Sequence, residues 1–282
     1  MFSLRLVGGG GSVVAAVLRR HSSAVLSGAV AAVAAATAAP PPADCFFSSS
    51  SAAETASALA KADALFESNE YGTLATTLRA SLAGKPDDAE LLWRLGRACK
   101  KMADAEQPKS PAKQALICEG FGCAEKAVAA NEGCGQAHKW YAILLSESGQ
   151  FEGTSATIKN SFVVRKHFER AVELSPADAT SRHLLGVWCF EVAKLSWIEQ
   201  KAAAALFATP PSATYEEAIA HFEAAETMDP GFYPKNMLLL SMALSKIGRK
   251  AEAVAWRNEC LAAKPCTPED VETINEAQKL KL

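Results

Sequence analysis

From Ala52 to the end of the 282-residue chain, apolar side chains recur at positions i, i+3 and i+4, with polar residues between them. This periodicity is typical of amphipathic helices that bury one face. Short clusters of Gly, Pro and Asn punctuate the pattern, and runs of β-branched residues are few. The pattern therefore predicts an all-α protein with about ten or eleven helices in residues 52–282.

The predicted helices form repeating units. Each of five units ends at a proline, or at a residue that occupies the equivalent position: Pro86, Glu132, Pro176, Pro230 and Pro265. Ten or eleven residues after each of the first four, a small residue follows: Gly96, Ala142, Gly186 and Ser241. A helix–turn–helix unit of about 34 residues is typical of the tetratricopeptide repeat. The first and last units match that length, and the middle three carry roughly 12, 10 and 20 extra residues.

Small residues at these places let two antiparallel helices approach closely, because a large neighbouring side chain fills the space. Leu78, Phe168 and Phe222 are the predicted large partners. Stacked hairpins then form a solenoid, which here is tetratricopeptide-like with elongated middle hairpins. In the final stretch, TPEDVETINEAQKLKL, Thr267 as N-cap and Pro268 at the first helical position predict a C-terminal capping helix.

The longest insertion contains the stretch LFATPPSATYEEAI, residues 206–219. Its two consecutive prolines stop a helix, Thr214 suits the N-cap of the next one, and Tyr215 begins it. All three insertions fall at the turn within a hairpin, so we expect them along one edge of the solenoid. Trp197 and Phe207 lie in the longest insertion, and we take them as candidate partner-binding residues.

The first 43 residues contain no Asp or Glu. Their basic residues are Arg5, Arg19 and Arg20. This bias is typical of transit peptides, whereas Gly8–Gly11 interrupts the place where a secretory signal would form its apolar region. Residues 1–51 are predicted to be a disordered leader, either a plain Ala-rich tail or a mitochondrial-targeting or membrane-anchoring segment. The repeat domain then occupies residues 52–282.

No residue pattern indicates an enzyme, a cofactor site or a metal site. The eight cysteines contain no C-x-x-C pair, which favours reduced, structural thiols. CEGFGC, residues 118–123, lacks the second pair of ligands that zinc needs. No glycine-rich phosphate loop is present in the sequence. Four histidines fall in different predicted helices, which favours structural roles for them: His138, His167, His183 and His221.

Several long stretches resemble the regulator of microtubule dynamics protein family, and the protein 1 type is nearest. They are AELLWRLGRACK (89–100), AHKWYAILLSESGQFEG (137–153), HFERAVELSPADATSRHLLGVWCFEVAKLSW (167–197) and LFATPPSATYEEAIAHFEAAETMDPGFYPKNMLLL (206–240). The resemblance covers roughly residues 55–270. It implies a helical repeat protein that associates with microtubules and spindle poles, has mitochondrial or cytoplasmic placement, and has no known enzyme activity.

Binding to microtubules would be helped by a basic surface, because the exposed tails of tubulin are acidic. The whole chain has a formal charge of −2, so its bulk charge indicates neither nucleic acid nor anionic membrane as a partner. Basic residues cluster in two hairpins, where on a net acidic body they are more often solvated helix faces, so the link to microtubules depends on the resemblance. The candidate partner-binding residues among them are Arg94, Arg97, Lys159, Arg165 and Lys166.

Three functions remain open at this point. The first is a non-enzymatic scaffold in the cytoplasm and cytoskeleton that binds tubulin or a spindle protein and regulates microtubule dynamics. The second is an adaptor that residues 1–45 direct to mitochondria or another organelle, where the solenoid groove binds a partner protein and only the leader contacts a membrane. The third, a lipid-handling protein, would need a pocket enclosed by the insertions.

Overall fold

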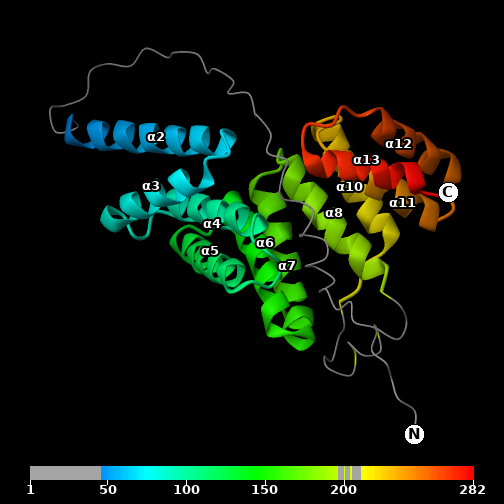
Figure 1. Cartoon of the computed structure of the whole chain (residues 1–282), viewed down its shortest axis with the longest axis horizontal. Coiled ribbons are helices and arrows are strands. Elements are labelled where there is room, and N and C mark those ends of the chain that lie inside the picture. Colours follow the sequence, from blue (N-terminus) through cyan, green and yellow to red (C-terminus); the bar gives the residue numbers. More distant parts are fainter. Residues whose placement is uncertain (1–45, 196–199, 201–203, 205–210) are drawn as a thin grey trace, which may run out of the picture.

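The computed structural model describes residues 46–195, 200, 204 and 211–282 (Figure 1). Eleven helices occur in these ranges, and no strand does. The first six are α2 (Phe46–Glu67), α3 (Tyr71–Gly84), α4 (Ala89–Asp104), α5 (Pro111–Ala130), α6 (Gly135–Glu152) and α7 (Thr154–Leu174). The others are α8 (Ala179–Ala193), α10 (Tyr215–Met228), α11 (Pro234–Lys246), α12 (Lys250–Ala262) and α13 (Pro268–Lys279). The all-α prediction is confirmed; α2 begins six residues before the predicted start of the repeat domain.

Consecutive helices pack as antiparallel hairpins: α2–α3, α4–α5, α6–α7, α8–α10 and α11–α12. The first helices of several hairpins also contact each other, as α4 does with α6 and α8 with α11. The last helix, α13, packs on both α11 and α12, where the sequence predicts a capping helix (Figure 1). The predicted solenoid is confirmed, because each hairpin covers an apolar face of its neighbour.

The extra residues of the middle hairpins take two forms. In two hairpins they lengthen the helices. The helices α4 and α5 have 16 and 20 residues, and α6 and α7 have 18 and 21, whereas α11 and α12 have 13 each. Gly153 alone separates α6 from α7, and its φ of 95° lies in the left-handed region that glycine tolerates best. In the third hairpin the extra residues connect α8 to α10. Trp197 and Phe207 of that connection lie outside the described residues.

Close approaches between helices occur at the predicted small residues. A Cβ added to Gly186 would lie 2.8 Å from the Phe222 ring, which fills the space between α8 and α10. A Cβ on Gly96 would lie 3.1 Å from the carbonyl oxygen of Gly120, so α4 and α5 touch through backbone. The hydroxyl of Ser241 donates a hydrogen bond of 2.7 Å to the carbonyl of Ala253 on α12. Side-chain size at these positions therefore sets the spacing within hairpins.

Both predicted N-caps are present. Thr214 accepts a hydrogen bond from the backbone amide of Glu217, whose carboxylate accepts one from the amide of Thr214. Thr267 and Asp270 form the same reciprocal capping box at the start of α13. Each box satisfies backbone amides that have no partner within the helix, which explains why the helices begin at these residues.

A buried polar network joins α8, α10 and α11. The Asn236 amide nitrogen donates to the carbonyl of Phe222 and to the Glu226 carboxylate, at 3.1 and 2.9 Å. Its amide oxygen therefore accepts from Nδ1 of His183, 2.8 Å away. Burial lowers the pKa of His183 to about 4, so the imidazole is neutral at pH 7. This network confirms the structural interpretation of His183.

Candidate protein-binding surface

The two candidate arginines of α4 are buried against α2. The Arg94 guanidinium donates to the carboxylates of Asp63, at 2.7 Å, and Glu90, at 2.6 Å. Arg97 donates to Asp63 at 2.9 Å, and its guanidinium lies 3.6 Å from the centre of the Phe66 ring. Arg94 and Arg97 are 8% and 7% exposed, so they stabilise the α2–α4 contact and do not form the solvated basic patch expected from the sequence.

The charge of Asp63 is maintained by these arginines. Burial alone would raise the pKa of the Asp63 carboxyl, but the hydrogen bonds and positive charges of Arg94 and Arg97 outweigh it and lower that pKa below its usual value. One carboxylate therefore pairs with two cations on α4, and Glu90 supplies a second carboxylate to Arg94. The sequence pattern did not reveal this pairing, because Asp63 is 31 residues before Arg94.

Arg165 on α7 holds the chain segment that leads into α10. Its Nε atom donates to Glu169 at 2.7 Å, and its Nη1 atom donates to the carbonyl of Ser212 at 3.1 Å. Its guanidinium also lies 5.0 Å from the centre of the Trp188 ring on α8. These contacts join three segments, so Arg165 has a structural role in addition to any role on the surface.

Lys159 and Lys166 are exposed on α7, unlike the arginines of α4. They are seven residues apart, which places them on the same side of the helix about two turns from each other. Neither lysine forms an ion pair with any residue that the structure describes. Arg170, one turn beyond Lys166, is also exposed and pairs with Glu173 at 2.9 Å. We call Lys159, Lys166 and Arg170 the basic face of α7.

A cavity of about 550 Å³ adjoins this face between α5, α6 and α7. Its lining includes Lys166 and Arg170, two histidines and four glutamates: Glu125, Glu132, Glu169 and Glu173. The Tyr141 ring stacks on His167 at 4.1 Å between ring centres, and the Nδ1 atoms of His138 and His167 are 2.9 Å apart. The sequence separated these histidines into different helices, and only the packing of α6 on α7 brings them together.

The protonation of the histidine pair follows from its contacts. Nε2 of His138 lies 3.0 Å from the carbonyl oxygen of Glu132, so this nitrogen donates and the Nδ1 atom accepts from His167. Burial lowers both pKa values; for His167, to which the nearby His138 also contributes, the pKa falls to about 4. The pair is therefore neutral at pH 7, and among the described residues the cavity has Lys166 and Arg170 as its only cations, beside four glutamates in its lining.

Comparison with known proteins places the chain in a family. The family model described as regulator of microtubule dynamics protein 1-3 matches residues 58–281. The chain belongs to this family. It is 41% identical over 227 residues to regulator of microtubule dynamics protein 1 of Bos taurus, covering 80% of this chain and 71% of the relative.

The regulator of microtubule dynamics proteins of type 3 are less similar. The Xenopus laevis protein 3 is 35% identical over 198 residues, which cover 69% of this chain and 42% of the relative. The higher identity to type 1 confirms the resemblance seen in the sequence. A crystal structure of a thermophilic TPR protein from Thermus thermophilus matches with a TM-score of 0.55 at 16% identity. It covers 79% of this chain and 98% of that protein, and confirms the tetratricopeptide-like fold.

The cysteines of this regulator of microtubule dynamics family member are free thiols in the part of the chain that the structure describes. Burial raises the pKa values of Cys99 and Cys189 to about 12, so neither thiol ionises at neutral pH. Among the described residues, no three His, Cys, Asp or Glu side chains are placed to hold a metal ion. Within the same ranges, no helix is long and apolar enough to cross a membrane.

Proposed function

We propose that this chain is a non-enzymatic repeat scaffold that binds microtubules through the basic face of α7 and regulates their dynamics. Its family supports a role in microtubule regulation. The observation that carries the choice of surface is that Lys159 and Lys166 are exposed on one side of α7 without an ion pair to any described residue. Action in the cytoplasm, at the spindle and its poles, is part of this proposal.

The dimensions of the basic face suit an extended acidic peptide such as a tubulin tail. From Lys159 to Arg170 is eleven residues of helix, or about 17 Å. An extended segment of about five residues covers that distance. The carboxylates of Glu169 and Glu173 lie beside the face and reduce its positive charge. The resulting attraction is modest, and salt is expected to weaken it because the lysines are exposed.

Charge reversal at both lysines tests the surface. In Lys159→Glu/Lys166→Glu, binding to polymerised tubulin is expected to weaken at least about tenfold in a co-sedimentation assay at low salt, because attraction becomes repulsion. The matched control is Lys61→Glu/Lys250→Glu, which makes the same change in net charge at exposed positions on α2 and α12. That control is expected to retain binding within about twofold, which is the scale of a non-specific charge effect.

The outcomes of this experiment separate the surface from the function. Equal losses in the two double variants would show that net charge, and not the α7 face, governs binding. If the unmodified chain does not pellet with microtubules at low salt, the proposal of direct microtubule binding is overturned. Loss of binding to microtubules whose acidic tails have been cleaved would support the proposed contact.

The alternative function is an organelle-anchored adaptor, and the charge of the leader favours it. Residues 1–45 contain three arginines, and Asp44 is their only acidic residue. If residues 1–45 target the chain, their fusion to a fluorescent protein is expected to localise to mitochondria. A variant with Arg5, Arg19 and Arg20 changed to Glu serves as the control and is expected to be diffuse. A diffuse signal from both fusions would contradict this alternative.

A further inference from the structure

Six lysine and arginine residues are more than nine-tenths buried in the part of the chain that the structure describes: Arg94, Arg97, Lys100, Lys101, Lys139 and Lys235. Five of them have a carboxylate within ion-pair distance. Arg94 and Arg97 pair with Asp63, as described above. The three lysine pairs are Lys100–Asp104, Lys139–Asp178 and Lys235–Glu276. Lys101 is the exception, with neither an ion pair nor a hydrogen bond to any described residue. The Lys101 Nζ atom is absent from the buried polar atoms that lack a partner, so this ammonium keeps contact with solvent although most of its side chain is covered. It is therefore accessible to a ligand.

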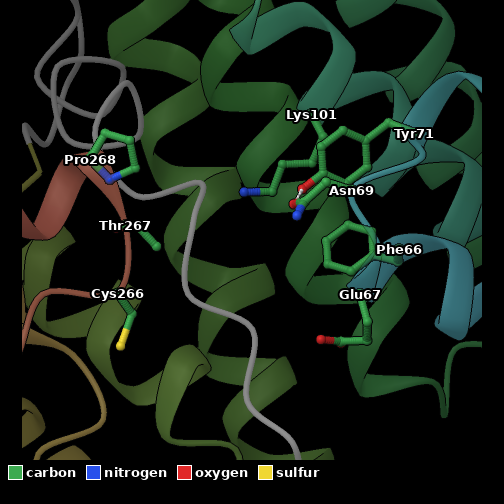
Figure 2. A pocket seen from close by; sticks show the side chains of 8 residues that line it. All are labelled: Phe66, Glu67, Asn69, Tyr71, Lys101, Cys266, Thr267 and Pro268. Atoms are coloured by element: carbon green, nitrogen blue, oxygen red, sulfur yellow. Dashed lines mark hydrogen bonds between the residues drawn. The ribbon is translucent and has the colours of Figure 1, made fainter.

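The Lys101 side chain extends into a cavity of about 270 Å³. One wall is the turn between α2 and α3, with the rings of Phe66 and Tyr71, and the other is the segment 266–268 at the start of α13 (Figure 2). The Tyr71 hydroxyl donates a hydrogen bond to the side chain of Asn69, which fixes the turn. A cation with an aromatic wall beside it thus occupies a hollow between segments that are far apart in the sequence (Figure 2).

The carboxylates near Lys101 do not neutralise it by direct contact. Asp104 binds the neighbouring Lys100, and Glu269 accepts a hydrogen bond of 2.7 Å from the Tyr233 hydroxyl. Burial raises the pKa of Glu269 to about 7, so this group carries only part of a charge at neutral pH. Burial also lowers the pKa of Lys101 to about 8, since the charges of Asp104 and Glu269 compensate only partly.

We propose that this cavity binds a monocarboxylate, with the Lys101 ammonium as its counter-ion and its apolar part against Phe66 and Tyr71. A single cation with Glu67 also in the lining favours a monoanion over a dianion such as phosphate. The volume suits a carboxylate that carries one ring or a short aliphatic chain. The site uses elements other than α7, so it does not depend on the proposed microtubule contact.

Calorimetric titration of the full chain with benzoate tests this site. Benzoate is expected to bind, whereas benzamide, which has the same ring and no charge, is expected to bind at least about tenfold more weakly because it cannot form an ion pair with the Lys101 ammonium. Inorganic phosphate is expected to bind more weakly than benzoate. Equal binding of benzamide, or tighter binding of phosphate, would overturn the assignment of a monocarboxylate.

Variants locate the site at Lys101. Lys101→Met is expected to weaken benzoate binding at least about tenfold, and Lys101→Arg, which retains the charge, to keep most of it. Lys61→Met, at an exposed position on α2, is the matched control and is expected to bind like the unmodified chain. Thermal unfolding of Lys101→Met without benzoate is expected to show a transition at or above that of the unmodified chain. Unchanged benzoate affinity in a folded Lys101→Met variant would refute the proposal.

Discussion

Valine in place of Gly186 is expected to lower the free energy of unfolding by about 3 kcal/mol, at the upper end of the usual cost of overpacking a core. A Cβ at this position would lie 2.8 Å from two ring carbons of Phe222, and the ring is fully buried between α8 and α10. The ring has no free space to move into, so the two helices must separate. Urea unfolding followed by circular dichroism measures the change.

The control for this prediction is Gly122→Val on α5, where an added Cβ meets no atom within 4 Å. Both sites are inside helices, so the effect of helix propensity is the same in both variants. The control is expected to change the free energy of unfolding by less than about 0.5 kcal/mol. Equal effects at Gly186 and Gly122 would show that the Phe222 contact does not set the spacing of the hairpin.

Asparagine in place of Asp63 is expected to destabilise the protein by about 2 kcal/mol, between the cost of breaking an exposed ion pair and that of breaking a buried one, because the arginines are buried and the carboxylate is partly exposed. Arg97 loses its only ion-pair partner among the described residues, and Arg94 keeps only Glu90. The side chains of the two arginines are 10% exposed or less, whereas that of Asp63 is 42% exposed, so water replaces the lost carboxylate only in part. The same urea unfolding assay measures this loss.

Glu119→Gln provides the comparison, since Glu119 pairs with Arg79 at 2.7 Å in an ion pair that is largely exposed. Its loss is expected to cost less than about 1 kcal/mol. If Asp63→Asn is as mild as Glu119→Gln, the arginines of α4 are more hydrated than their burial indicates. They would then return to the set of candidate binding residues.

Local sequence signals were enough for the helical class and for the starts of α10 and α13. Thr214 and Thr267 were recognisable as caps because a capping box needs only residues within one turn. Gly186 and Phe222 were recognisable as a contact because their positions recur from unit to unit. The sequence did not show what structure the insertions take. Extra residues lengthen a unit equally whether they extend its helices, as in α6 and α7, or form a connecting segment.

The candidate site was only partly predictable. The basic residues of α4 and α7 have similar helical spacing, yet Arg94 is buried against Asp63 and Lys166 is exposed. The contact between His138 and His167 gave no signal in the sequence, because the two residues belong to different helices. Such contacts depend on how one helix is rotated against another, which a pattern within one helix does not specify.

By itself, the sequence determined the helix pairs, the turns between them and the places where helices approach closely. These features follow from side-chain size and capping chemistry within one unit. Only the tertiary structure decided which cations are paired, which are exposed and which extend into a cavity without an ion pair to a described residue. Arg94, Lys166 and Lys101 illustrate the three cases. The charge of each side chain is a property of the residue, but its burial is set by helices that are distant in the sequence.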